Sequence, residues 1–388
     1  MNNDKMQQPP FVYDKWILTT VLALLAIGIV MVGSASMVIS DHHYHTPFYF
    51  LFKYVCYVLL GLGLSWVVTR VPMQWWQEKG FSFLLIGLFF LFIVLIPGIG
   101  RVVNGSRRWI GLGFLTFQVS ELMKLVMILY LARYLTRFQR ELETQFSIFL
   151  RPMIILAVLA FLLLLEPDFG ALVVIAMVTF AMLFLANVRL WPFILLALFA
   201  VLSLLLLAWI EPYRLTRLAS VWHPWQDPFG SGYQLTQSLI AFGRGGLFGV
   251  GLGNGIQKLF YLPEAYTDFI FAVLGEEGGL LGCMIVLGLF SSLIFRTFQL
   301  ARKAFAQKNL FPGYLAIGLG FWLGLQAIIN MSVNVGLLPT KGLTLPFMSY
   351  GGSSMLISCV AAGLLLRVSY EVSVYHNALD FSNSNEVN

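Results

Sequence analysis

Long apolar stretches separated by short polar segments dominate the chain. Most of them approach the length of about 20 residues that an α-helix needs to cross the hydrocarbon core of a bilayer. The pattern therefore predicts an all-α polytopic membrane protein with about ten transmembrane helices. The apolar runs are 16–38, 49–68, 81–99, 117–134, 152–166, 170–187, 190–210, 269–295, 313–338 and 351–370.

Two parts of this pattern need interpretation. The fifth and sixth runs are separated only by Glu166-Pro167-Asp168-Phe169. Together they are too long for one crossing, so we expect two spans joined by a tight turn. The segment 211–267, between spans seven and eight, is the longest loop. Its amphipathic stretch 233–242 predicts a short helix lying at the membrane interface.

These boundaries predict one membrane domain over residues 16–375, which contains the long outer loop 211–267. Polar tails, 1–15 and 376–388, flank it. The first run is longer than the apolar core of a signal peptide, which has about 7–15 residues, so we expect an uncleaved first span.

Composition supports a membrane protein and excludes other classes. Of the 388 residues, 59% are hydrophobic and only 11% are charged, against about 25% charged in soluble domains. The net charge of +6 does not indicate nucleic-acid binding, because most lysines and arginines fall on inner segments if both termini are cytoplasmic. The three cysteines lie in apolar runs. The histidines of the 42–45 segment are expected in a short loop without the set of carboxylate and cysteine ligands that a site would need, so no metal site is expected.

Polar residues of the spans and short loops collect on the outer side in this orientation, which predicts a functional site at the outer membrane face. The candidates for that site are Arg107, Arg108, Glu121, Lys124, Asp268, Lys341, Ser349, Gly351 and Gly352.

Several candidates have a structural alternative. Glu121 and Lys124 share a helix face at i,i+3, and they either line a functional cavity or lock helices together. Asp268 is either a general base with a raised pKa or a helix N-cap. Glu276 and Glu277 also leave both interpretations open.

The basic pair and the glycine turn are equally ambiguous. Arg107 and Arg108 would bind a diphosphate or make routine headgroup contacts. Gly351 and Gly352 would present backbone N–H groups to an anion or would permit close helix packing.

Five long motifs resemble the SEDS family (shape, elongation, division and sporulation). The resemblance covers nearly the whole chain, and the sequence after span nine is more similar to the division member than to the elongation member. Val119 departs from the pattern, since the family usually has proline there. The motifs are Asn104-Gly105-Ser106-Arg107-Arg108-Trp109-Ile110, Glu166-Pro167-Asp168-Phe169-Gly170, Leu262 to Phe271 followed by Glu276-Glu277, Asn330 to Gly336, and Leu338 to Ser354.

The resemblance implies ten spans in the bacterial cytoplasmic membrane and a peptidoglycan glycosyltransferase that polymerises lipid II at the outer face during cell division. It implies a class B penicillin-binding protein and other division proteins as partners. Asp268 matches the family's essential loop aspartate, and Glu121 and Lys124 match its polar cavity pair. Lys341 and the turn from Ser349 to Ser354 match its C-terminal motif.

The expected chemistry follows from these roles. Asp268 would deprotonate or orient the acceptor hydroxyl. Arg107, Arg108, Lys124 or Lys341 would stabilise the departing diphosphate, with or without a divalent cation. The rival functions are a lipid II flippase and a non-catalytic scaffold of the division machinery. The outer clustering argues against a flippase, which needs a polar path to both faces.

Overall fold

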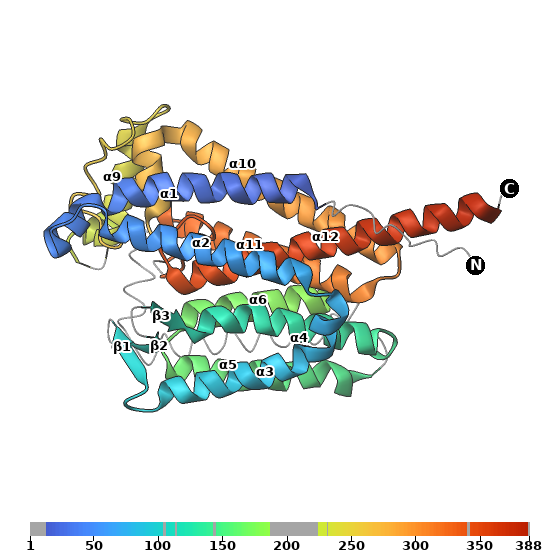
Figure 1. Cartoon of the computed structure of the whole chain (residues 1–388). Helices are drawn as coiled ribbons and strands as arrows, with labels where there is room; N and C mark the ends of the chain where they lie inside the picture. Colours follow the sequence, from blue (N-terminus) through green and yellow to red (C-terminus); the bar gives the residue numbers. More distant parts are fainter. Residues whose placement is uncertain are drawn as a thin grey trace.

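The computed structural model describes residues 13–103, 106–112, 115–142, 145–186, 224–230, 232–339 and 342–386. These residues form a bundle of long helices with a small sheet at one end (Figure 1). The helices are α1 (Lys15–Tyr44), α2 (Tyr49–Arg70), α3 (Met73–Leu95), α4 (Val119–Leu142), α5 (Phe146–Leu165), α6 (Phe169–Leu185), α9 (Tyr233–Gly245), α10 (Ile270–Ala306), α11 (Leu310–Asn334) and α12 (Gly352–Glu386), with a short 3-10 helix, η1 (Pro224–Gln226).

The prediction of a helical membrane protein is confirmed. Every predicted apolar run corresponds to a helix except 190–210, which lies outside the described residues. The tight turn between α5 and α6 is where the sequence placed it. Several helices continue past their apolar runs: α1 extends to Tyr44 and so includes His42 and His43, which the sequence analysis placed in a loop.

Seven described helices are long and apolar enough to cross a membrane: α1, α2, α3, α5, α10, α11 and the 352–374 part of α12. The apolar helix α6 is shorter, with 17 residues. Helix α4 carries charged residues, yet it is buried on nearly all sides and packs against α3, α6 and α11. Its polar side chains Ser120, Glu121 and Lys124 are buried and therefore face protein rather than lipid.

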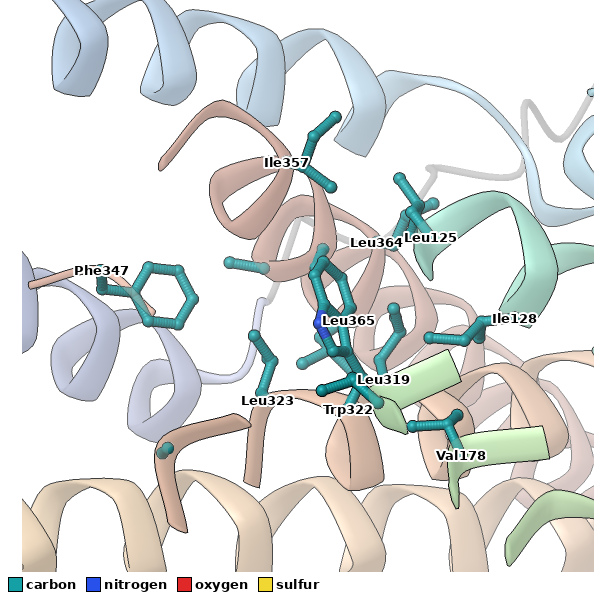
Figure 2. Close-up of a cluster of buried hydrophobic side chains, with 14 of the residues drawn as sticks. Leu125, Ile128, Val178, Leu319, Trp322, Leu323, Phe347, Ile357, Leu364 and Leu365 are labelled. Carbon is teal, nitrogen blue, oxygen red and sulfur yellow. The ribbon is translucent and has the colours of Figure 1, made fainter. Parts of the chain in front are cut away.

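Helix α4 joins the two halves of the bundle. Figure 1 shows α3–α6 on one side and α1, α2 and α10–α12 on the other. Apolar side chains from both halves meet in the core (Figure 2), where Leu125 and Ile128 of α4 lie beside Trp322 of α11 and Leu364 of α12. This packing holds the helices that carry the polar candidates in one unit.

One end of the bundle carries the start of α1 and the last part of α12 (Figure 1). The Asp14 carboxylate accepts hydrogen bonds from the N–H groups of Trp16 and Ile17, so it caps α1. The same carboxylate pairs with Arg296 of α10 at 2.7 Å. The Asp14 N–H donates to the Ser369 hydroxyl of α12 at 3.1 Å. These bonds hold the beginning and end of the membrane domain together.

The opposite end carries a three-stranded antiparallel sheet, which the sequence analysis did not predict. Its strands are β1 (Gly100–Val103), β2 (Ser106–Leu112) and β3 (Leu115–Gln118), in that order. Asn104-Gly105 separates β1 from β2 in the sequence, and Asn-Gly is a strongly favoured pair for two-residue hairpin loops. We call this the sheet end of the bundle; it also carries residues 166–168, 246–269 and 342–351.

Helix α10 is broken at Gly279, whose φ of 64° lies in the left-handed region. The break lets the preceding loop pair with the helix backbone. The Leu280 N–H donates to the Gly246 carbonyl at 2.9 Å, and the Val250 N–H donates to the Glu276 carbonyl at 3.0 Å. The first part of α10 is therefore fixed to residues 246–251.

A close contact at Gly28 of α1 generates a stability prediction. A methyl group at Gly28 would lie 2.5 Å from the Tyr54 hydroxyl and 2.8 Å from the Phe347 carbonyl. Tyr54 donates to that carbonyl at 3.0 Å. We expect Gly28→Ala to lower the thermal unfolding temperature of the detergent-solubilised protein, since overpacking costs about 1–3 kcal/mol.

The matched control is Gly63→Ala in α2, because a methyl group there would have no neighbour within 4 Å. It should leave the unfolding temperature unchanged or raise it slightly, since alanine favours a helix. Equal unfolding temperatures for both variants would show that the Gly28 contact does not constrain the fold.

Candidate functional site

Asp268 lies at the sheet end, directly before α10. The N-cap residue of α10 is Phe269, so the N-cap alternative for Asp268 is wrong. The Asp268 carboxylate is half-buried and makes no hydrogen bond to the part of the chain that the structure describes. Burial, and then the negative charge of Glu264, raise the pKa of Asp268 to about 7. A carboxyl group with this pKa can accept a proton near neutral pH.

Two buried asparagines of α11 fix the backbone of Asp268. The side-chain amides of Asn330 and Asn334 donate to the Asp268 carbonyl at 2.9 and 3.0 Å. Asn334 also accepts the N–H of Ala272 at 3.1 Å, so it holds the first turn of α10. Both asparagines belong to the motif Asn330 to Gly336, but they were not among the predicted site residues.

The same helix face holds the C-terminal motif. Asn330 donates to the Leu343 carbonyl at 2.6 Å, and Gln326 donates to the Thr344 carbonyl at 2.9 Å. We call Gln326, Asn330 and Asn334 the α11 polar stripe. Its successive residues are four positions apart, so they lie on one face of α11, about 6 Å apart along the helix axis.

The C-terminal motif comes close to the Asp268 carboxylate. A methyl group at Gly342 would lie 2.9 Å from Asp268 Oδ2. Gly342 therefore leaves space beside this oxygen that a larger residue would fill. Lys341, the preceding residue and a predicted diphosphate ligand, lies outside the described residues.

The predicted pairing of Glu121 and Lys124 is confirmed. Lys124 Nζ lies 2.8 Å from Glu121 Oε1 and also donates to Gln326 Oε1 at 2.7 Å. Its ammonium group lies 5.7 Å from the centre of the Trp322 ring, within cation–π range. Lys124 is 2% exposed. The pair thus joins α4 to the α11 polar stripe, which supports the helix-locking alternative.

Arg107 and Arg108 both donate hydrogen bonds to protein groups. Arg108 donates to the carbonyls of Glu166 and Pro167 at 3.0 and 2.5 Å, and its guanidinium lies 3.8 Å from the Asp168 carboxylate. Arg107 donates to the Leu95 carbonyl at the end of α3. Arg108 therefore clamps the turn between α5 and α6.

Asp168 connects that turn to α4. Its carboxylate caps α6 and accepts hydrogen bonds from Ser120 at 2.6 Å and Gln118 at 3.0 Å. Helix α4 begins at Val119, so the departure from proline has not displaced its polar first turn. The Gln118 N–H donates to the Ser353 hydroxyl, which links this cluster to the start of α12.

Glu166, in the same turn, is completely buried, and neither carboxyl oxygen has a hydrogen-bond partner among the described residues. Burial, and then the charge of Asp168, raise the pKa of Glu166 to about 8. Glu166 is therefore mostly neutral at pH 7.

The turn around Ser349, Gly351 and Gly352 is tightly packed. The Ser349 hydroxyl accepts the N–H of Leu345 at 2.8 Å. A methyl group at Gly352 would overlap the Tyr57 ring of α2, and one at Gly351 would lie 3.0 Å from Thr344 Cγ2. These contacts support the packing alternative for the glycines over an anion site.

Glu276 and Glu277 have structural roles. Glu276 pairs with Arg244 of α9, and Glu277 pairs with the buried Lys258, each at 2.5 Å. Glu277 also accepts a hydrogen bond from Ser34 of α1 at 2.8 Å. Both glutamates hold the loop that precedes Asp268. Within the described ranges, no three His, Cys, Asp or Glu side chains group closely enough to hold a metal ion.

The site therefore consists of one proton-accepting carboxyl group, that of Asp268, whose surroundings are held in place by amides, salt bridges and close packing.

Residues 15–374 match a family model described as cell cycle protein, which covers FtsW, RodA and SpoVE. The chain is 57% identical to a probable peptidoglycan glycosyltransferase FtsW of Coxiella burnetii, over 92% of this chain and 96% of that protein.

Solved structures agree with the family model. One chain, from a study of how a peptidoglycan synthase complex coordinates polymerization and crosslinking, matches with a TM-score of 0.77 and 30% identity, over 93% of this chain and 98% of that one. The rod shape determining protein RodA of Thermus thermophilus matches with a TM-score of 0.68 and 28% identity, over 92% and 97% of the two chains. The chain therefore belongs to the FtsW, RodA and SpoVE family of cell cycle proteins.

Proposed function

We propose that this protein is a peptidoglycan glycosyltransferase that polymerises lipid II into glycan strands at the outer face of the bacterial cytoplasmic membrane during cell division. The observation that carries the proposal is Asp268, whose raised pKa suits a general base and whose backbone is fixed by Asn330 and Asn334. The names of its relatives, probable peptidoglycan glycosyltransferases, support the same reaction.

In the reaction, an acceptor sugar hydroxyl attacks the anomeric carbon of the donor. A new carbon–oxygen bond forms, the bond from that carbon to the diphosphate oxygen breaks, and the hydroxyl proton passes to Asp268. The half-buried position of the carboxylate raises its affinity for that proton. Gly342 leaves room beside Asp268 Oδ2, where the hydroxyl would approach.

The departing diphosphate needs positive charge. Arg108 donates two hydrogen bonds to the α5–α6 turn and one to Ser106, and Lys124 is bound to Glu121 and Gln326. Of the four predicted cations, Arg107 and Lys341 are therefore the preferred ligands. In the sequence, Lys341 directly precedes Gly342, and Gly342 lies beside the Asp268 carboxylate. A divalent cation would stabilise the same negative charge.

The membrane orientation follows from the proposed reaction. The sheet end faces outward, and the end that carries Asp14 and Arg296 faces the cytoplasm together with both termini. Basic residues of α10 near Arg296 fit this orientation, because cytoplasmic segments are enriched in lysine and arginine. A class B penicillin-binding protein would cross-link the strands, which agrees with the related structure from a synthase complex that coordinates polymerization and crosslinking.

The base assignment predicts the effect of removing the carboxylate. We expect Asp268→Ala and Asp268→Asn to lower lipid II polymerisation by about 10²- to 10⁴-fold, the usual contribution of a general base. The measurement is the initial rate with purified protein and its transpeptidase partner. The matched control is Asp41→Asn, an exposed carboxylate that should retain wild-type rates. Wild-type polymerisation by folded Asp268→Ala protein would exclude the base role and favour a scaffold.

The raised pKa predicts a pH dependence. The active form is the carboxylate, so the polymerisation rate should rise with pH and reach half of its maximum near pH 7. Glu264→Gln removes the neighbouring negative charge that helps to raise the pKa, so the half-maximal point should move to lower pH.

The control for this pH profile is Glu78→Gln, an exposed carboxylate in the first turns of α3. It should leave the profile in place. A half-maximal point that is the same with and without the Glu264 charge would contradict the assignment of this limb to Asp268.

A further inference from the structure

A group of aromatic rings begins at the end of α1 and leads to the residues around Asp268. The rings of Tyr44 and Tyr49 stack with a centroid distance of 3.8 Å and an angle of 16°. Phe50 contacts both rings edge-on, at 5.6 and 5.5 Å. We call Tyr44, Tyr49, Phe50, Tyr266 and Tyr350 the aromatic row.

The row is continuous with the candidate site. Phe50 lies 5.0 Å from the Tyr266 ring and 5.4 Å from the Tyr350 ring. The Tyr350 N–H donates to the Tyr266 carbonyl at 2.9 Å. Tyr266 precedes Asp268 by two residues, so one end of the row belongs to the segment that presents the carboxylate.

The end of the row farther from Asp268, formed by Tyr44 and Tyr49, is exposed, but its backbone is held in place. The side chains of Tyr44 and Tyr49 are 47% and 37% exposed. The buried Ser40 hydroxyl accepts the Tyr49 N–H at 3.0 Å and donates to the Thr46 carbonyl at 2.7 Å, which fixes the turn between α1 and α2. A binding surface gains affinity from such rigidity, because little side-chain and loop freedom is lost on binding.

An ordinary belt of interfacial aromatics does not explain the row. A position at headgroup level does not require belt tyrosines and tryptophans to touch one another, whereas the rings of the row form a connected series of contacts. Burial, and then the nearby phenols of Tyr57, Tyr266, Tyr49 and Tyr44, raise the pKa of Tyr350. Phe52, which is 72% exposed and lies outside the row, is an example of a ring that suits lipid contact.

We propose that the aromatic row binds the sugar rings of the growing glycan strand. This inference rests on the proposed function and adds the path that the polymer takes away from, or towards, Asp268. A pyranose ring has an apolar C–H face that packs on an aromatic ring, while its hydroxyl and acetamido groups need hydrogen-bond partners. A row of neutral tyrosines provides both, and an extended polymer suits a series of rings better than a single small ligand does.

The test is the length of the glycan strands made from lipid II by the purified protein with its transpeptidase partner. For the double variant Tyr44→Ala and Tyr49→Ala, we expect strands several-fold shorter than wild type, because the strand dissociates sooner. The first coupling of two lipid II molecules should stay near the wild-type rate. The double variant Tyr44→Phe and Tyr49→Phe keeps the stacked rings and should make strands of intermediate or wild-type length.

The matched control is Phe52→Ala, which removes an exposed ring outside the row and should leave strand length unchanged. Wild-type strand lengths from the double alanine variant would overturn the inference. Equal shortening by Phe52→Ala would also overturn it, because the effect would then belong to lipid contacts. If the double variant does not fold, Tyr44→Ala alone is measured with the same expectation. Failure of the wild-type protein to polymerise lipid II would instead overturn the proposed function.

Discussion

The hydrogen bonds of the α11 polar stripe determine how the rest of the sheet end is arranged. Unsatisfied polar groups are costly inside a membrane protein because no bulk water reaches them. Gln326, Asn330 and Asn334 are buried, and each of them bonds to a segment from another part of the chain. One helix face thereby fixes Lys124, the C-terminal motif and Asp268 relative to one another. The candidate base occupies a defined position although it lies in a loop.

This arrangement separates the polar residues into two classes. Most charged groups near the sheet end have charged or backbone partners within the protein, as Arg108 has in the α5–α6 turn and Glu277 has in Lys258. The carboxyl groups of Glu166 and Asp268 have no hydrogen-bond partner among the described residues, but Glu166 is completely buried, whereas Asp268 is half-buried on a fixed backbone. A preorganised catalytic residue must be held in a fixed position while its reactive atoms stay available to the substrate.

The sequence predicted the helices, because the apolar length of a span follows directly from the thickness of the bilayer. The placement of the candidate residues on the outer side, which rests on the distribution of arginine and lysine, stays a prediction. The sequence also predicted the Glu121–Lys124 pair, since i,i+3 neighbours on a helix must lie close together. It could not assign Arg108 or Glu276 to structural roles. Arg108 binds Pro167 and Glu276 binds Arg244, and these partners are distant in sequence and come together only in the folded chain. The small sheet was missed because its short strands lie beside much stronger helical signals.

The burial of Lys124 has a consequence for how the protein enters the membrane. A lysine inside a span opposes insertion, by about 2.5–3.5 kcal/mol at the helix centre. The partner of Lys124, Gln326, belongs to a helix synthesised some 200 residues later. Of the two side chains that bind the Lys124 ammonium group, only Glu121 belongs to α4 and is present when this helix is synthesised. Glu121 lies one turn before Lys124 on the same helix face, and its Oε1 is 2.8 Å from Lys124 Nζ. The ion pair with Glu121 therefore lowers the cost of inserting α4 before α11 is synthesised, and Gln326 of α11 then adds a second partner for Lys124.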